Sequence, residues 1–393
     1  MRHPVLFLFY LALLSMLGFL ATDMYLPAFD AMKQDLATSA GTISASLSLF
    51  LAGFACGQLF WGPLSDRLGR KPVLLAGLGI FTVACLAVCL TASPLMLLIW
   101  RFVQAFGVCA AAVSWQSLVM DHYPAHRRQK IFATVMPLVA LSPALAPLLG
   151  AWLLEHYHWR SVFVVLAAIT LLLMAATLRV PRPRQQDVSV TDRVAADTDV
   201  SFLQLLKDKG YRGNVTLYAA CSASFFAWLT GSPFILTALG LSPADIGLSY
   251  LPQTLTFLAG GFGCRMLMNR FSSRQLLPWL LAMYGVSIAL IMLDALAGQP
   301  SLAGLLIPFC GLAMANGAIY PIVVSAALSR FPGVSGKAAA LQNTLQLGLC
   351  FLFSLFVSSQ PQATLVTTVC AMGVTVMLAL YGYCQQKDFS NRT

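Results

Sequence analysis

The stretch Gly62-Pro63-Leu64-Ser65-Asp66-Arg67-Leu68-Gly69-Arg70-Lys71 separates two long apolar runs, residues 42–61 and 73–92. Its glycines permit a tight turn between two helices. Asp66 could meet a helix N-terminus or an arginine, and the basic residues favour the cytoplasmic side of a membrane. A plain positively charged hairpin is the simpler alternative. The combination of acid, glycines and cations between two apolar runs indicates a more specialised loop.

The composition around this loop excludes an ordinary soluble enzyme. The chain has 393 residues, of which 59% are hydrophobic and 10% charged, whereas soluble domains carry about 25% charged residues. In lipid every backbone polar group must be satisfied internally, which leaves helices or a closed barrel. The apolar runs are too long and continuous for barrel strands, so the sequence predicts an all-α membrane protein.

About twelve membrane spans can be placed along the chain. Their connections are short, except for a polar stretch that reads as a linker between two six-helix halves. We therefore expect a first bundle over 1–180, a cytoplasmic linker over 181–211 and a second bundle over 212–393. The spans are 5–28, 42–61, 73–92, 95–120, 131–154, 161–179, 213–239, 244–268, 275–297, 301–328, 338–359 and 363–384.

The charges predict the orientation of the chain. The net charge is +10, and Lys and Arg gather in alternate short loops, which is a topology signal rather than a sign of nucleic-acid binding. Both termini and the linker are expected in the cytoplasm. The ten cysteines lie mostly in apolar segments and indicate buried thiols, with no metal spacing.

Two charged residues lie inside apolar spans. Asp23 belongs to the first span and Arg101 to the fourth, at a similar depth. Charges within a membrane are costly, and they are usually paired and functional. We therefore expect a direct or water-linked pair that couples transport to protons, with a purely structural ion pair as the alternative. No catalytic, nucleotide-binding or metal motif is present, so we expect no enzyme activity, no metal, no cofactor and transport driven by a gradient.

Several aromatic and amide side chains fall within the spans and predict a cavity for a planar, polar, uncharged ligand. Amides in lipid need partners and should face the interior, where they could equally serve only to join helices. The candidate substrate-binding residues are Tyr25, Trp115, Gln116, Phe225, Trp228, Gln253, Asn316, Tyr320, Gln342, Asn343 and Gln346.

The loop at 62–71 resembles the loop motif of the major facilitator superfamily. The resemblance implies two pseudo-symmetric six-helix bundles, and a gating role for the residues Gly62, Asp66, Arg67, Gly69, Arg70 and Lys71. It also implies that Asp66 latches on the helix start near 336–339. The run that begins at Arg101 resembles the family's R-x-x-Q-G-x-G motif, with Ala105 in place of the first glycine.

The fifth span resembles the family's antiporter motif, but Ala146 and Ala151 replace two of its glycines, which weakens an inference of drug antiport. We expect Pro143, Pro147 and Gly150 to kink this helix, because proline removes a helical hydrogen bond.

Over nearly its whole length the chain is similar to the drug-resistance-type, bicyclomycin-resistance branch of that superfamily. Within it the run 218–228 is especially similar to bacterial purine nucleoside transporters. This implies a monomeric, multi-pass protein of the bacterial inner membrane, in contact with lipid, which imports adenosine, inosine or guanosine with protons. A proton-coupled multidrug or bicyclomycin-type efflux antiporter is the alternative, and a membrane-embedded sensor is a more distant one.

Overall fold

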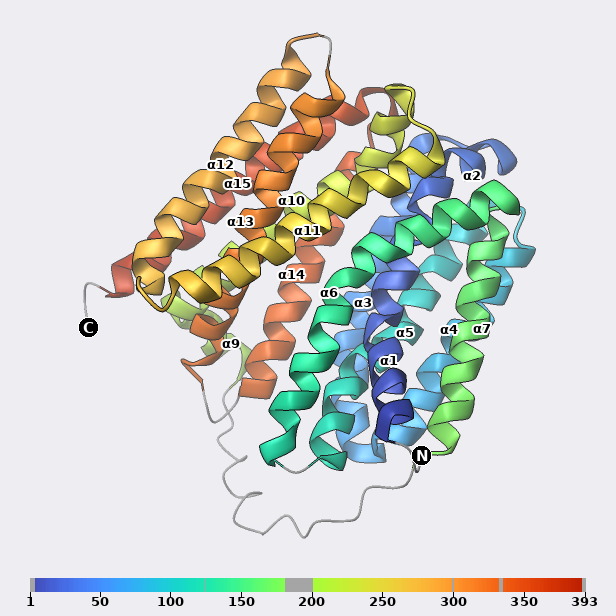
Figure 1. Ribbon diagram of the computed structural model, residues 1–393, viewed down its shortest axis with the longest axis horizontal. Coiled ribbons are helices and arrows are strands. Elements are labelled where there is room, and N and C mark those ends of the chain that lie inside the picture. Colours follow the sequence, from blue (N-terminus) through green and yellow to red (C-terminus); the bar gives the residue numbers. More distant parts are fainter. Residues whose placement is uncertain (1–3, 124, 181–200, 299, 332–334, 391–393) are drawn as a thin grey trace. The chain divides into compact units, whose positions relative to one another are not determined.

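The computed structural model describes residues 4–390 except 124, 181–200, 299 and 332–334. This part of the chain is helical and contains no β-strand (Figure 1). Six long helices precede residue 181: α1 (Pro4–Asp23), α3 (Ala40–Leu68), α4 (Arg70–Leu90), α5 (Pro94–His122), α6 (Ala125–His156) and α7 (Arg160–Leu178). Six follow residue 200: α10 (Lys209–Ala238), α11 (Pro243–Leu267), α12 (Ser273–Leu296), α13 (Leu302–Leu328), α14 (Ser335–Ser358) and α15 (Thr364–Ser390).

Four short elements complete the described chain: η1 (Leu26–Ala28), α2 (Phe29–Asp35), α9 (Phe202–Lys207) and η3 (Pro361–Ala363). Within the described residues, 10 helical segments are long and apolar enough to cross a membrane. Of the predicted spans, those that correspond to α6 and α11 are not among these 10. The prediction of an all-α membrane protein is confirmed.

Two local features set the helix ends nearest the charged residues. Pro27 has no N–H, so the Asp23 carbonyl cannot accept the helical hydrogen bond from it. The first helix therefore ends at Asp23 rather than at residue 28 as predicted. The chain then turns through η1 into α2. Gly69 has φ +88° and separates α3 from α4, a conformation that glycine adopts at little cost.

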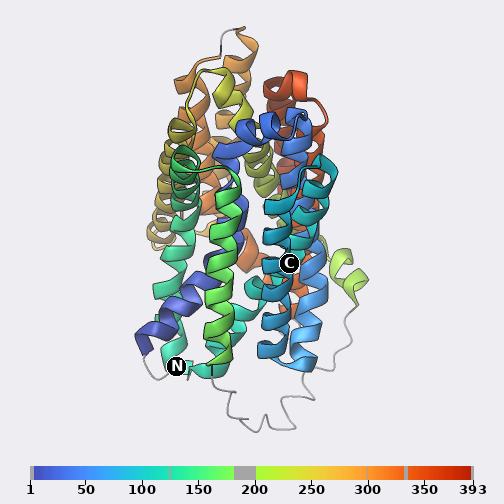
Figure 2. The ribbon, with the colours of Figure 1, turned by 90° about the vertical axis from the view of Figure 1, so that its right-hand side faces the viewer.

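The chain divides into two compact units. Unit 1 comprises Met1–Pro183 and Ser232–Thr254, and unit 2 comprises Arg184–Gly231 and Leu255–Thr393. Residues 232–254 therefore pack with the first unit, although the sequence assigns them to the second half. In unit 1, α5 packs against α3 and α4, α4 packs against α7, and α1 packs against α5 and α6. In unit 2, α12 packs against α13 and α15 (Figures 1 and 2).

The last part of the predicted linker is structured. Residues 202–207 form α9, which begins at a capping box made by Ser201 and Gln204. After α9, the Asp208 carboxylate accepts two hydrogen bonds from Arg330, at 2.7 Å from Nε and 2.8 Å from Nη2. Burial acts to raise the pKa of Asp208, but these bonds outweigh it and hold the pKa below its ordinary value. The last part of the predicted linker over 181–211 thus contains a short helix.

Candidate functional site

Asp23 occupies the last position of α1 and is buried, with 4% of its surface exposed. The helix break that Pro27 imposes leaves the carboxylate at the start of an irregular turn inside unit 1. The next residue, Met24, lies against α6, because a Cβ at Gly150 would collide with the Met24 carbonyl. Gly150 thus permits close contact between α6 and α1 directly beside Asp23.

Arg101 on α5 is completely buried. Its Nη1 and Nη2 each donate to the Ala21 carbonyl of α1 at 3.1 Å, and Nη1 also donates to Gln104 Oε1. The guanidinium carbon lies 4.0 Å from the ring centre of Tyr25 and 4.4 Å from that of Phe50. Cations attract aromatic faces most strongly when desolvated, so the two rings compensate part of the cost of burying this charge.

The structure brings Asp23 and Arg101 into one region but not into direct contact. No ion pair within 4.0 Å joins them in the part of the chain that the structure describes, where Arg101 instead holds the carbonyl two residues before Asp23. The direct form of the predicted pair is therefore absent among the described residues, and the water-linked form stays a prediction. A side-chain contact depends on rotamers and on the break in α1, and equal depth in the membrane determines neither.

Sequence reasoning missed the partners that hold Arg101. Gln104 lies one helical turn after Arg101 and donates from Nε2 to Cys85 Sγ of α4 at 2.8 Å. The R-x-x-Q spacing could have revealed this pair, because residues three apart share a helix face. Phe50 had no comparable signal among the many aromatic residues of the spans.

The substrate candidates of unit 1 lie in different surroundings. Tyr25 is buried beneath Arg101, and its hydroxyl lies 3.1 Å from Ser46 Oγ. Gln253 on α11 is buried and donates from Nε2 to the Ser249 carbonyl at 2.9 Å. On α5, Trp115 is buried whereas Gln116 is exposed. These four side chains therefore differ in burial, and their role in binding stays a prediction.

Unit 2 contains a buried group of neutral side chains. The Trp228 ring stacks on Phe309 with centroids 4.8 Å apart, and Phe225 lies 5.9 Å from the same ring. Phe309 thus occupies one face of Trp228, a contact that the sequence did not indicate. Asn316 on α13 donates from Nδ2 to the Cys221 carbonyl of α10 at 3.1 Å.

Among the buried polar atoms of unit 2 that have no hydrogen-bond partner among the described residues, three belong to predicted substrate-binding residues. They are Trp228 Nε1, Asn316 Oδ1 and Gln342 Oε1. Such atoms are uncommon in folded proteins and often mark a site that water or a ligand satisfies. One donor and two acceptors with neutral character suit a polar, uncharged ligand.

The other candidates of unit 2 are partly buried. Tyr320 packs edge-on against Tyr218, with ring centroids 5.0 Å apart, and Phe257 lies 5.8 Å away. On α14, Asn343 and Gln346 are of intermediate exposure. Gln346 Nε2 lies 3.9 Å from Cys350 Sγ. These contacts are compatible with the alternative role of joining helices.

The loop at 62–71 is held through its basic residues. Lys71 Nζ donates to the Leu178 and Val180 carbonyls after α7, at 2.7 and 3.1 Å. Arg70 Nη1 donates to Ser65 Oγ at 3.0 Å, while Arg67 is exposed. No neighbour approaches the Cβ position of Gly62 or Gly69. The side chain of Asp66 and the latch position at 336 lie outside the described side chains, so the predicted latch stays a prediction.

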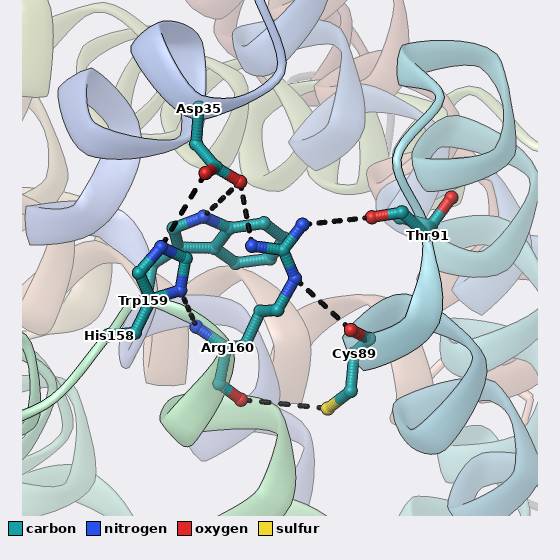
Figure 3. Close-up of polar contacts among 6 residues, drawn as sticks. All are labelled: Asp35, Cys89, Thr91, His158, Trp159 and Arg160. Carbon is teal, nitrogen blue, oxygen red and sulfur yellow. Dashed lines mark hydrogen bonds and ion pairs between the residues drawn. The ribbon is translucent and has the colours of Figure 1, made fainter.

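The sequence did not predict a network of polar contacts that lies beside α2 in unit 1 (Figure 3). The end of unit 1 that contains α2 is called the α2 end. Asp35 Oδ2 accepts from Arg160 Nη1 at 2.7 Å and from Trp159 Nε1 at 3.1 Å. Arg160 also donates to the Cys89 and Thr91 carbonyls, at 3.1 and 3.0 Å. We call these five residues the α2 network. Asp35 and Arg160 have opposite charges and lie in loops predicted on the same side of the membrane. This pattern could have predicted the ion pair between them.

This arrangement of helices and buried charges defines a polytopic membrane transporter. A family profile of the Major Facilitator Superfamily matches residues 11–354, and the chain belongs to that family. Its members are transporters rather than enzymes, are driven by ion gradients and need no cofactor. Among the described residues no group of three or more His, Cys, Asp or Glu side chains could hold a metal ion.

Known relatives cover almost the whole chain. It is 26% identical over 97% of its length to the Bicyclomycin resistance protein homolog of Haemophilus influenzae, covering 96% of that protein. It is 31% identical over 93% of its length to the Chloramphenicol resistance protein of Pseudomonas aeruginosa, covering 87% of that protein. The structure of a D-xylose-proton symporter matches with a TM-score of 0.75 at 15% identity, over 95% of this chain and 96% of the other, and this similarity supports the fold alone.

Proposed function

We propose that this chain is a proton-coupled exporter of small antimicrobial compounds, with Asp23 as the proton-carrying group and Arg101 as its electrostatic neighbour. The observation that carries the proposal is the buried carboxylate at the break after α1, in a chain whose relatives are named for drug resistance. An acid within a membrane is energetically costly, and the acids found there commonly serve as proton relays.

The neutral group in unit 2 would recognise the compound. Asn316 Oδ1 and Gln342 Oε1 can accept hydrogen bonds and Trp228 Nε1 can donate one, while Phe225 offers an aromatic surface. In this arrangement unit 1 carries the proton and unit 2 contacts the compound.

Import of purine nucleosides, as by transporters of the PunC type, is the second candidate. It is favoured by the same neutral acceptors, which could pair with a purine edge. Export is preferred because two of the relatives that cover most of the chain are named for resistance.

The membrane arrangement is part of the proposal. We place the protein in the bacterial inner membrane as a monomer, with both termini in the cytoplasm and the α2 end outside. The loop at 62–71 would control the cytoplasmic gate through Asp66. A reporter fused after Lys387 should be cytoplasmic, and Asp66→Asn should slow transport at unchanged expression.

Purified protein in liposomes tests the two candidates. With a pH gradient imposed, we expect chloramphenicol to accumulate against its own gradient, and adenosine, inosine and guanosine neither to bind nor to accumulate. Saturable nucleoside uptake without chloramphenicol transport would establish the import candidate instead.

A further inference from the structure

The short helix α9 lies where the long helices α10, α13 and α14 of unit 2 begin or end. It packs against α14 (Figure 1), and Leu205 is completely buried in a cluster that includes Ala327 near the end of α13 and Ala338 near the start of α14. Asp208 has extended backbone angles, φ −70° and ψ 115°, so the chain turns there and α9 does not continue into α10. Because all three long helices are apolar enough to cross a membrane, α9 lies at the level where these spans leave the hydrocarbon.

The side of α9 that faces away from this cluster carries large apolar side chains. Leu203 has 70% of its surface exposed and Phe202 has 42%, while Leu206 is partly buried. These positions are one and four residues apart, so they form one continuous stripe on the helix. We call Phe202, Leu203 and Leu206 the α9 stripe. Water is an unfavourable neighbour for such a stripe, whereas the boundary between lipid headgroups and acyl chains accommodates it.

Lysines border the α9 stripe. Lys207 is exposed and lies beside Leu203, since residues four apart are neighbours on a helix surface. Lys337 of α14 places its Nζ 5.0 Å from the ring centre of Phe202. The stripe therefore has a cation next to each of its two most exposed side chains.

The charge beside α9 is positive overall. Lys209, the first residue of α10, is also exposed. The one acidic residue of the stretch 201–212 is Asp208, and Arg330 already balances it through a contact of 2.7 Å. The surface around the α9 stripe thus complements a negatively charged partner that also has an apolar part.

We propose that α9 is an interfacial helix that binds anionic phospholipids of the leaflet at its end of unit 2. The α9 stripe enters the boundary between headgroups and acyl chains, and the lysines reach the phosphates on their flexible stems. Helices that combine Phe and Leu with Lys bind membrane surfaces by apolar burial together with attraction to anionic lipids. A free phosphate ion would use the lysines but not the stripe. The inference does not depend on which compound the protein transports or in which direction.

Hydrogen–deuterium exchange of the full-length protein in lipid nanodiscs tests the proposal. One set of discs contains phosphatidylcholine alone, and the other contains equal parts of phosphatidylcholine and anionic phosphatidylglycerol. A helix held on the surface opens less often, so the amides of 201–209 should exchange at least about fivefold more slowly with phosphatidylglycerol, which is the contribution of one lysine at an anionic surface. High salt screens this attraction and should remove the difference.

A variant with Lys207→Gln and Lys209→Gln together should lose most of the difference between the two kinds of disc. Lys337 is kept, because it lies within the predicted latch position. The matched control combines Arg270→Gln with Arg274→Gln, which removes two exposed cations from the connection between α11 and α12 of the same unit. The control should retain the wild-type difference.

Leu203→Gln separates the apolar contribution from the electrostatic one. It should speed exchange of 201–209 in both kinds of disc, because the stripe loses its most exposed member while the lysines remain.

Three outcomes would overturn the inference. The first is equal exchange of wild-type 201–209 in both kinds of disc, and the second is a wild-type difference in the Lys207 and Lys209 double variant. The third is protection that survives Leu203→Gln and is the same in detergent as in the discs, which would show that another part of this chain covers the α9 stripe. The comparisons of lipid and of salt use the wild-type protein alone, so they stay decisive if a variant fails to fold.

Discussion

The interiors of the two units differ in the polar groups that they bury. Among the described residues, the buried side chains that can carry a charge of Asp or Arg type are Asp23 and Arg101, and both belong to unit 1. The buried polar side chains of unit 2 are neutral, for example Asn316 and Gln342. A buried charge responds to protons, whereas a neutral amide discriminates between ligands by hydrogen bonding. The comparison supports the proposed division between energy coupling in unit 1 and recognition in unit 2.

The largest expected effect is on energy coupling. Asp23→Asn removes the buried carboxylate while retaining its shape, so accumulation of substrate driven by a pH gradient should be abolished, and binding should change less than twofold. Transport into liposomes and equilibrium binding measure the two quantities. The control is Asp30→Asn, which alters a partly exposed carboxylate paired with Lys33 on the same side of unit 1. Uphill transport by Asp23→Asn would show that the buried carboxylate of unit 1 does not couple transport to protons.

Arg101→Lys should destabilise unit 1 strongly. Lysine keeps the charge but lacks the planar fork that reaches both Ala21 and Gln104 and stacks on Tyr25. Leaving a buried charge poorly compensated costs about 3 kcal/mol. The midpoint of thermal unfolding in detergent measures the loss, with the exposed Arg270→Lys as the control. An unchanged midpoint would show that the guanidinium contacts do not contribute to stability.

Asn316→Ala should sharpen the comparison by changing recognition without changing coupling. Removing its side-chain acceptor should weaken substrate binding by about 1–2 kcal/mol, while accumulation at saturating substrate should keep its dependence on the pH gradient. Asn214→Ala is a matched control, because Asn214 is a buried amide of α10 that donates to the Gly210 carbonyl. Equal losses of affinity in both variants would indicate a general defect of unit 2.

The smallest expected effect concerns Asp208. Its folded-state pKa lies below the ordinary value because of Arg330, so its contribution to stability is present above pH about 4 and is lost as pH falls through the folded-state pKa. Asp208→Asn should cost about 1 kcal/mol near pH 7, since the pair is partly exposed. The unfolding midpoints of wild type and Asp208→Asn should differ at pH 7 and should be similar at pH 3. The same difference in midpoint at both pH values would show that the Asp208–Arg330 ion pair does not cause the loss of stability.

The sequence predicts much of the helical fold and little of the side-chain geometry. Long apolar runs identify spans because the membrane imposes one length and one hydrogen-bonding solution, and charges inside such runs identify Asp23 and Arg101. The contact between Arg101 and Ala21, and the stacking of Phe309 on Trp228, depend on helix rotation and rotamers. Hydropathy does not encode either.

Of two missed features, one had a local signal in the sequence. The Ser201 to Gln204 spacing matches a capping box and could have predicted α9 within the supposed linker. The packing of residues 232–254 with unit 1 had no such signal, because it depends on contacts with α2 and α6 that are distant in sequence.

The membership of residues 232–254 in unit 1 has a consequence for biosynthesis. Asp35 and Arg160 meet across 125 positions, so their contact can form once α7 has been inserted into the membrane. The surface of α6 around Pro147 is covered by Gly247 only after roughly seventy further residues beyond α7 have left the ribosome. During that interval the nascent first unit presents an incomplete face. A chain truncated before residue 232 should therefore be recognised by membrane proteases, and supplying the second half as a separate polypeptide should protect it.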